Sequence, residues 1–398
     1  MNSWDYYSET IDRIVWSEGT GRGPLRDRVE RMLQTEPRLR GIESVEIDGI
    51  ADLPEEYLSP RTIVVRPEQR GDLGRCPGTH GHLCCNYITL NVYLGCTLGC
   101  TYCIMQSYLR NRTLEVHLPS SDTVSMIRRV AEAHPDRTVR IGTGEVGDSL
   151  LYDPLFGISG ELIDALSDLR NLRFEVKTKT DFVDHLPGNP VAGGNGDVLV
   201  GRDEETFRTD APEGPRTPRR NTVVSFSLNP PEVVAAEEGV AASLDERLGA
   251  AERAVSRGYR VAFHFDPMIH IPDWERAYLS VVDRLGRFRG ITPEWVSLGT
   301  LRYPPSLKAM IEERAYALDE FVRSGDGKMR YLQPIRARMY RTVKRRLRDV
   351  LPETPVYLCM ESPVVWRDMQ RAAPGDERPL REIMQPVTIG GERAGGMR

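Results

Sequence analysis

The sequence predicts an α/β protein built around a partial parallel barrel. Six short apolar segments between residues 86 and 298 alternate with helical segments of about 10–15 residues, which is the pattern of successive βαβ units. The chain has 398 residues, of which 40% are apolar, so it is long enough to bury one large core and carry extensions. We therefore expect a partial (β/α)6 barrel with TIM-like connectivity.

The chain divides into four expected parts. Residues 1–85 are expected to form an N-terminal extension without catalytic residues, with a helix over 24–33 and a strand over 62–65. Residues 86–300 are expected to form the barrel, and residues 301–371 a C-terminal extension that closes it. The strands of the barrel are expected at 86–94, 138–142, 172–177, 223–228, 260–265 and 295–298, and its helices at 121–133, 158–169, 244–257 and 275–288.

Two segments are too poor in large apolar residues to order themselves. Residues 184–221, between the third and fourth strands, are rich in Gly, Pro, Asp and Arg, which predicts a flexible insertion. This insertion is either a lid or a surface loop without function. The tail, residues 372–398, is expected to be disordered.

Composition excludes several classes of protein. No run approaches the roughly 20 apolar residues of a membrane span, and the N-terminus lacks the features of a signal peptide, so we expect a cytoplasmic protein. A net charge of −5 gives no overall attraction to nucleic acid. Seven cysteines, an odd number, argue for metal ligands or reactive thiols instead of disulfides.

A basic helix is expected over residues 335–350. Ile335, Met339, Val343 and Leu347 share one face, and seven basic residues surround the rest. Such a helix can bind phosphates, or it can be a solvated charged surface.

Three cysteines, Cys96, Cys100 and Cys103, lie on a glycine-flanked loop directly after the first expected strand. Thiolates at this spacing suit one metal centre, and three ligands instead of four leave one iron of a cubane cluster open. A zinc knuckle would need a fourth ligand. Because loops after parallel strands gather at one face of a barrel, this loop is expected at the catalytic face.

A second cysteine-rich loop spans residues 76–85 and contains Cys76, Cys84, Cys85 and two histidines. Its residue types suit a second zinc or iron site. Alternatively, the loop packs beside the first site with its thiols buried, because the vicinal cysteines would point apart on an extended backbone.

The Cys-x3-Cys-x2-Cys spacing, with an aromatic residue before the third cysteine, resembles the signature of the radical S-adenosylmethionine superfamily. Within it, six segments resemble the spore photoproduct lyase family: 102–106, 140–145, 177–180, 225–229, 297–300 and 357–361. The resemblance implies a [4Fe-4S] cluster on Cys96, Cys100 and Cys103, whose open iron binds S-adenosylmethionine. Reduction by a donor such as flavodoxin or ferredoxin would release a 5′-deoxyadenosyl radical that takes a hydrogen atom from the substrate.

The resemblance also implies roles for residues around the cofactor. Tyr102 would lie against the adenine, and Glu145 and Asp148 would approach the amino group, since a carboxylate suits an ammonium partner. Lys179 would meet the carboxylate of S-adenosylmethionine and Ser227 its polar end. Lys179 and Ser227 can also be read as solvated loop residues.

The chain departs from the family where the fate of the substrate radical is decided. Glu145 aligns with the cysteine that returns a hydrogen atom in photoproduct lyases, and Ile104 replaces the tyrosine after the third cluster cysteine. A carboxylate cannot donate a hydrogen atom as a thiol does. Cys359, after a late strand-like run, could substitute, as could Cys84 or Cys85, although Cys359 is equally a candidate core thiol.

These departures set the functional expectation. The catalytic candidates are Tyr102, Glu145 and Cys359. The expected substrate is a nucleoside-like, nucleotide-like or related small molecule that is converted in a biosynthetic pathway. Repair of a thymine-dimer photoproduct is the first alternative, with DNA as a less favoured partner. A non-catalytic iron–sulfur protein that binds nucleic acid is the second. Candidates for substrate contacts follow the fifth and sixth strands: His264, Asp266, His270, Arg302 and Tyr303.

Overall fold

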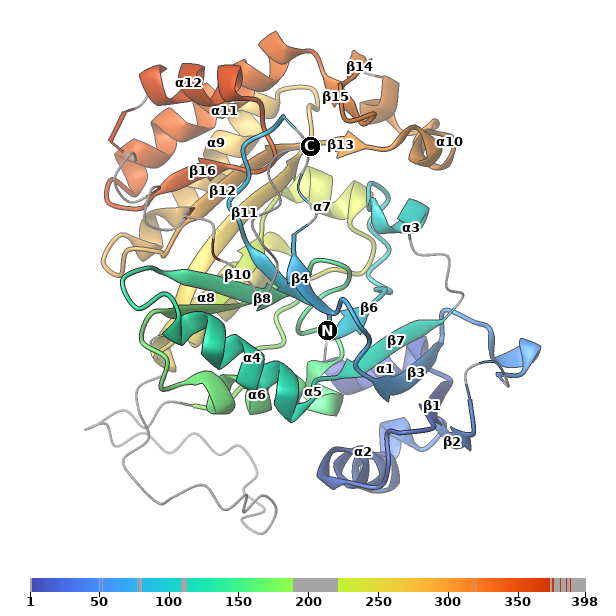
Figure 1. Ribbon diagram of the computed structural model, residues 1–398. Helices are drawn as coiled ribbons and strands as arrows, with labels where there is room; N and C mark the ends of the chain where they lie inside the picture. Colours follow the sequence, from blue (N-terminus) through green and yellow to red (C-terminus); the bar gives the residue numbers. More distant parts are fainter. Residues whose placement is uncertain are drawn as a thin grey trace.

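The centre of the fold is a curled sheet of eight strands (Figure 1), in the order β16-β12-β11-β10-β9-β8-β5-β4. The computed structural model describes residues 2–49, 51, 53–76, 78, 81–108, 113–188, 221–318, 320–372, 374, 375, 380, 384 and 387. The strands of this sheet are β4 Leu73–Arg75, β5 Ile88–Leu90, β8 Val139–Thr143, β9 Leu172–Thr178, β10 Thr222–Ser227, β11 Arg260–Met268, β12 Val296–Thr300 and β16 Val356–Leu358.

The predicted partial barrel is confirmed. Strands β5, β8, β9, β10, β11 and β12 follow one another in space and pair in parallel, and β16 extends the series beyond β12. Only β4 is antiparallel to its neighbour. Strands β8 and β12 are buried along their whole length, as expected of parallel strands covered on both faces.

The first predicted strand, 86–94, is wrong as a single element. The chain forms β5 in the curled sheet and then β6, Tyr93–Leu94, which pairs with β7 in a different sheet. The apolar run is continuous because both pieces are buried, so periodicity alone could not reveal the change of sheet.

Helices cover the outer side of the curled sheet (Figure 1). Helix α4 begins after Ser120, whose hydroxyl accepts a hydrogen bond from the Thr123 N–H, and α8 begins with a capping box between Ser243 and Glu246. The helices α4 Ser121–Glu132, α6 Ile158–Leu166, α8 Leu244–Ser256 and α9 Trp274–Arg284 connect strands of this sheet, and the short helices α3 Met105–Tyr108, α5 Asp153–Phe156 and α7 Pro231–Glu237 lie in the loops.

The N-terminal residues form a second sheet in the order β2-β1-β3-β7-β6, parallel except for β6. Its elements are α1 Ser3–Thr10, β1 Arg13–Ser17, α2 Pro24–Thr35, β2 Glu43–Ile47, β3 Thr62–Pro67 and β7 Leu114–Leu118. The sheet lies beside the curled sheet, and one hydrophobic core runs through both (Figure 1). The Tyr6 hydroxyl is hydrogen-bonded to Thr97 Oγ1 at 2.5 Å, so this part of the chain reaches the three-cysteine loop.

The C-terminal part adds a small antiparallel sheet and two helices: β13 Arg302–Tyr303, α10 Lys308–Ile311, β14 Phe321–Arg323, β15 Met329–Tyr331, α11 Gln333–Val350 and α12 Pro363–Ala372. Helix α11 is the predicted basic helix. Arg338 pairs with Glu275 at 2.9 Å, and Arg341 and Arg346 each pair with an aspartate at 2.5 Å. These neighbouring carboxylates favour the charged-surface interpretation over a phosphate-binding one.

Parts of the predicted insertion and tail are outside the described residues. Residues 189–220 of the insertion are among them, as is most of 372–398. Of the tail, Leu380 and Val387 are buried, and the Val387 carbonyl accepts a hydrogen bond from Arg75 at 3.0 Å. The predicted disorder of the tail remains a prediction. Among the described helices, none is both long enough and apolar enough to cross a membrane.

Candidate active site

A cavity of about 640 Å³ opens at the carboxyl ends of the strands of the curled sheet. Loops after β6, β8, β9 and β12, and the C-terminal parts of β10 and β11, contribute to its wall, as expected for a parallel barrel. Every predicted cofactor and cluster residue lines it: Cys96, Cys100, Tyr102, Cys103, Glu145, Asp148, Lys179 and Ser227. Ile104 also lines the cavity.

Glycines shape the three-cysteine loop. Gly95 and Gly99 have φ values of +87° and +76°, in the left-handed region that glycine adopts without strain. The Gly95 N–H donates to the Val146 carbonyl at 3.0 Å, which ties the loop to the segment after β8. A Cβ on Gly147 would overlap the Tyr93 carbonyl oxygen, so the two segments approach this closely only because Gly147 has no side chain.

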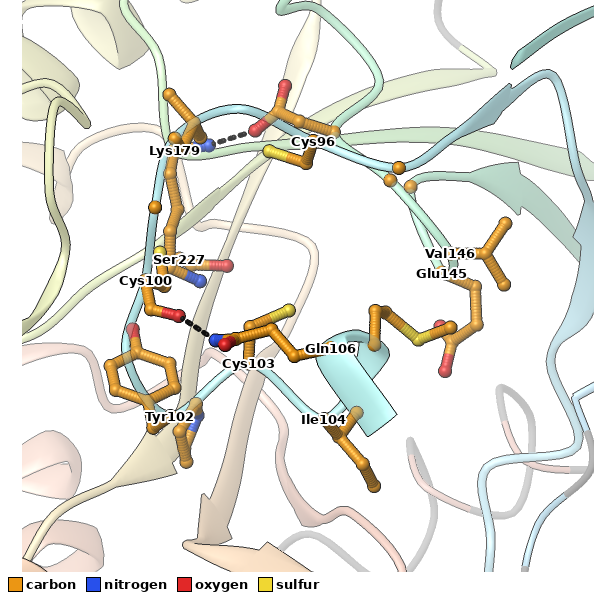
Figure 2. Close-up of a pocket in the computed structure, with 18 of the residues that line it drawn as sticks. Cys96, Cys100, Tyr102, Cys103, Ile104, Gln106, Glu145, Val146, Lys179 and Ser227 are labelled. Atoms are coloured by element: carbon orange, nitrogen blue, oxygen red, sulfur yellow. Dashed lines mark hydrogen bonds between the residues drawn. The ribbon is translucent and has the colours of Figure 1, made fainter. Parts of the chain in front are cut away.

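Figure 2 shows the three thiols around one open space, with Glu145 across from them. Burial raises the pKa of Cys100 to about 12, although the nearby Lys179 acts in the opposite direction. Burial also raises the pKa of Cys96, whose residue is exposed to the open cavity. Within the described residues, no three Cys, His, Asp or Glu side chains surround a single ion position. In a cubane each thiolate binds a different iron, so these three thiols fit a [4Fe-4S] cluster better than a single zinc ion. Binding of the cluster would displace the thiol protons.

A buried ion pair holds Tyr102 in place. The Tyr102 hydroxyl donates to Glu238 Oε1, Glu238 pairs with Arg247, and both members of the pair have no exposed side-chain surface. Asn229 donates to the same carboxylate oxygen at 2.8 Å, and Arg247 also donates to the Ser227 carbonyl at 2.8 Å. The network therefore links the aromatic residue of the cysteine motif to the end of β10.

Replacing Arg247 by methionine is expected to lower the free energy of unfolding by about 3–5 kcal/mol, because Glu238 would remain as a buried charge without its partner. The loss should shrink at low pH, since protonation of Glu238 removes that charge. Urea unfolding at several pH values measures it. The double variant Glu238→Gln/Arg247→Met is the control and should lose less; an equal loss would mean that packing, not charge, is responsible.

Glu145 is held by two side chains. Lys177 Nζ lies 2.9 Å from Glu145 Oε2, and the Cys76 thiol lies 3.8 Å from Oε1. Burial lowers the pKa of Lys177, but the nearby Glu145, Tyr87 and Glu175 together outweigh it and raise that pKa well above its usual value. The ammonium group also lies 4.5 Å from the centre of the Tyr87 ring. Glu145 therefore reaches the cavity as a fixed, ion-paired carboxylate.

Asp148 organises the turn after β8. Its Oδ1 accepts hydrogen bonds from the Leu150 and Leu151 N–H groups and from the Thr178 hydroxyl, and its Oδ2 accepts one from the Lys179 N–H at 2.7 Å (Figure 2). With about four lone-pair sites on a carboxylate, little capacity is left for a cofactor amino group. Its predicted contact with that group remains a prediction.

The predicted substrate contacts are brought together only in part. His264, Asp266 and Arg302 line the cavity, whereas His270 and Tyr303 do not. Arg302 and Asp266 form a two-point ion pair with distances of 2.9 and 3.2 Å. Cys359 is not among the lining residues; its sulfur lies 3.3 Å from Arg302 Nη2. Its predicted role as hydrogen donor remains a prediction.

Sequence reasoning missed the segment that supports the cysteine loop. The Glu237 carbonyl accepts a hydrogen bond from the Thr101 N–H, and the Val240 N–H donates to the Leu98 carbonyl, both at 2.9 Å. Gly239, at φ +53°, follows the C-terminus of α7, where a left-handed glycine commonly ends a helix. A glycine that ends a helix can be recognised in the sequence. Its contact with Leu98 cannot, because it joins segments that lie far apart in the chain.

No family model matches the chain. The curated spore photoproduct lyase of Clostridium acetobutylicum is 22% identical over 69% of this chain and 74% of its own length. That of a Geobacillus species is 24% identical over 55% of this chain and 58% of its own. A solved spore photoproduct lyase variant with a dinucleoside spore photoproduct has a TM-score of 0.67 at 21% identity, covering 87% of this chain and 98% of that one. Another, with bound S-adenosylmethionine and the same substrate, has a TM-score of 0.66 at 20% identity, with the same coverage.

The curled parallel sheet with a three-cysteine loop at its carboxyl edge is the fold that the chain shares with the solved spore photoproduct lyases, whose partial barrel is of the radical S-adenosylmethionine type. In sequence, the chain is distantly similar to the curated spore photoproduct lyases.

Proposed function

We propose that the chain uses a [4Fe-4S] cluster and S-adenosylmethionine to take a hydrogen atom from a nucleoside-like or nucleotide-like small molecule. The observation that carries this proposal is that three cysteines, three lysines and three carboxylates line one cavity. When bound, the cluster and S-adenosylmethionine would supply a carbon radical. Cys96, Cys100 and Cys103 would hold the cluster and leave one iron open.

The other residues would bind and orient the cofactor and substrate. Tyr102, fixed by Glu238, would present its ring to the adenine, and Lys179 would pair with the carboxylate of S-adenosylmethionine. Glu145, neutralised by Lys177, would receive the amino group. Asp266 in β11 and Arg302 in β13 would contact the polar groups of the substrate.

Anaerobic reconstitution tests the radical chemistry. The reconstituted protein should bind about four irons at the three-cysteine site and, with a reductant, should convert S-adenosylmethionine to 5′-deoxyadenosine. Flavodoxin or ferredoxin is a suitable physiological donor to compare with a chemical reductant. A reconstituted protein that binds S-adenosylmethionine but yields no deoxyadenosine would contradict the proposal.

Replacing Lys179 by methionine is expected to raise the KM for S-adenosylmethionine roughly 10- to 100-fold, the cost of losing one charge-assisted hydrogen bond. The change spares the Lys179 backbone N–H that binds Asp148, so the turn is retained. Lys328→Met, the same substitution beside Arg302 on the cavity wall, is the matched control and should leave this KM unchanged. Equal changes in both variants would argue against a specific role for Lys179.

The nature of the substrate separates two versions of the proposal. The relatives bind a dinucleoside photoproduct. We favour a biosynthetic substrate because Glu145 and Ile104 stand at the positions where the family aligns its hydrogen-donor cysteine and its second tyrosine. A dinucleoside photoproduct assay under reducing conditions decides between them, and turnover would support repair.

A thiol elsewhere could still return the hydrogen atom, and Cys359 remains the candidate. If it does, Cys359→Ala should preserve deoxyadenosine formation and lower product formation. The alternative of a non-catalytic nucleic-acid-binding protein receives no support from α11, whose Arg338, Arg341 and Arg346 pair with neighbouring carboxylates.

A further inference from the structure

A second, smaller cavity of about 60 Å³ gathers the remaining thiols of the chain. Of its nine lining residues, four are Cys76, Cys84, Cys85 and Cys359. The chain has seven cysteines, and the other three are those of the active-site loop. Every cysteine therefore belongs to one of two sites, although the four thiols of the second come from two distant segments, the 76–85 loop and the end of β16.

Backbone hydrogen bonds hold these segments together. Cys76 N–H donates to the Tyr87 carbonyl at 2.9 Å, which closes the base of the 76–87 loop next to the β4–β5 pair. The Leu83 N–H donates to the Glu361 carbonyl at 2.9 Å, which brings the tip of the loop beside Cys359 at the end of β16. These backbone contacts bring the two segments that carry the four cysteines to one cavity.

The surroundings suit thiolates bound to a metal. Arg302 Nη2 lies 3.3 Å from the Cys359 sulfur, and Arg75 also lines the cavity. Arg140, only 3% exposed, adds a third positive charge near Cys85, and its Nε and Nη1 have no hydrogen-bond partner among the described residues. Four thiolates around a divalent ion or a cluster carry net negative charge, which Arg75 would offset in part. Arg302 and Arg140 would share their charge between the thiolates and the carboxylates that they already face, Asp266 at 2.9 Å and Glu175 at 3.7 Å.

We propose that Cys76, Cys84, Cys85 and Cys359 form a second metal centre with four thiolate ligands, for zinc or for iron with sulfide. Four protein ligands leave no open position, in contrast to the three-cysteine loop, so this centre is structural. The described thiols do not surround a single ion position. A cluster binds each thiolate at a separate iron, whereas zinc requires the side chains to rotate.

The centre would support the wall of the active-site cavity. Cys76 contacts Glu145 at 3.8 Å, and Cys359 contacts Arg302 at 3.3 Å, and both of these partners line that cavity. A metal that fixes the Cys359 thiolate would also fix the Arg302 guanidinium beside it. A metal-bound Cys76 thiolate could no longer donate to Glu145, which Lys177 would then hold alone.

The test uses the full-length triple variant Cys96→Ala/Cys100→Ala/Cys103→Ala, which retains only the four thiols of the second cavity. It lacks the active-site ligands, so the result does not depend on radical chemistry. After incubation with zinc, or anaerobically with iron and sulfide, and then desalting, elemental analysis should find about one zinc or one cluster per chain. Whichever metal is retained identifies the centre, and a variant that retains neither overturns the proposal.

A thiol count provides the second measurement. Unfolded, the triple variant should present four thiols to a disulfide reagent; folded with the retained metal, it should present almost none. Adding Cys84→Ser and Cys85→Ser should abolish metal retention, and circular dichroism establishes whether this variant folds. If the folded variant with all five substitutions retains the metal fully, the metal binds elsewhere and the proposal is overturned. Equal thiol reactivity of the triple variant with and without metal would also overturn it.

Discussion

Replacing Cys100 by alanine is expected to abolish the formation of 5′-deoxyadenosine, a loss of about 10⁶-fold or more, the usual lower bound of enzymatic acceleration. Two thiolates would remain where three are needed, so the cluster would be held weakly and two of its irons would lack protein ligands. Iron content after anaerobic reconstitution and chromatographic detection of deoxyadenosine measure both steps.

The substitution removes a ligand but spares the loop. The Cys100 carbonyl oxygen accepts hydrogen bonds from the Cys103 N–H at 3.1 Å and the Gln106 amide at 2.8 Å, and alanine retains both (Figure 2). The urea unfolding curve of the metal-free variant should therefore stay close to that of the parent chain. Undiminished deoxyadenosine formation by the variant would show that Cys100 is not a cluster ligand.

Local pattern was sufficient to predict the barrel. Strands β8 to β12 were predicted within a few residues because each is a short apolar segment, and amphipathic helices follow β8, β10 and β11. The N-terminal sheet was not predicted as a sheet, since its order β2-β1-β3-β7-β6 combines strands from both sides of the cysteine loop. No local property of residues 43–47, which alternate between exposed and partly buried positions, indicates that pairing.

Spacing similarly indicates that the three proposed cluster ligands lie together, but it does not indicate the residues that support them. Three cysteines within eight residues must lie near one another, whatever the rest of the fold does. Glu238 and Arg247 are different, because their ion pair stabilises Tyr102 across more than 130 residues of sequence. The gathering of Cys76 and Cys359 in one cavity likewise depends on the pairing of β4 with β5 and on the bridge from Leu83 to Glu361. Such contacts follow from topology, which a single sequence leaves open.

Gly239→Ala tests the most important of these supports. A Cβ at this position would overlap the Leu98 carbonyl oxygen and approach the Gly99 carbonyl oxygen to 3.1 Å, and both belong to the backbone between Cys96 and Cys100. Backbone atoms cannot rotate away as a side chain can, so the loop must shift, and the left-handed φ of +53° adds strain for alanine.

Because the cluster depends on the relative positions of all three thiols, we expect Gly239→Ala to reduce both bound iron and deoxyadenosine formation about 100-fold, the effect of a displacement near 1 Å in a catalytic site. Gly249→Ala is the matched control. This residue lies within α8, where the nearest atom to a new Cβ is an arginine nitrogen at 3.9 Å, and alanine should stabilise the helix by up to about 1 kcal/mol. If Gly239→Ala binds a full cluster and cleaves S-adenosylmethionine normally, the 237–240 segment does not position the cysteine loop.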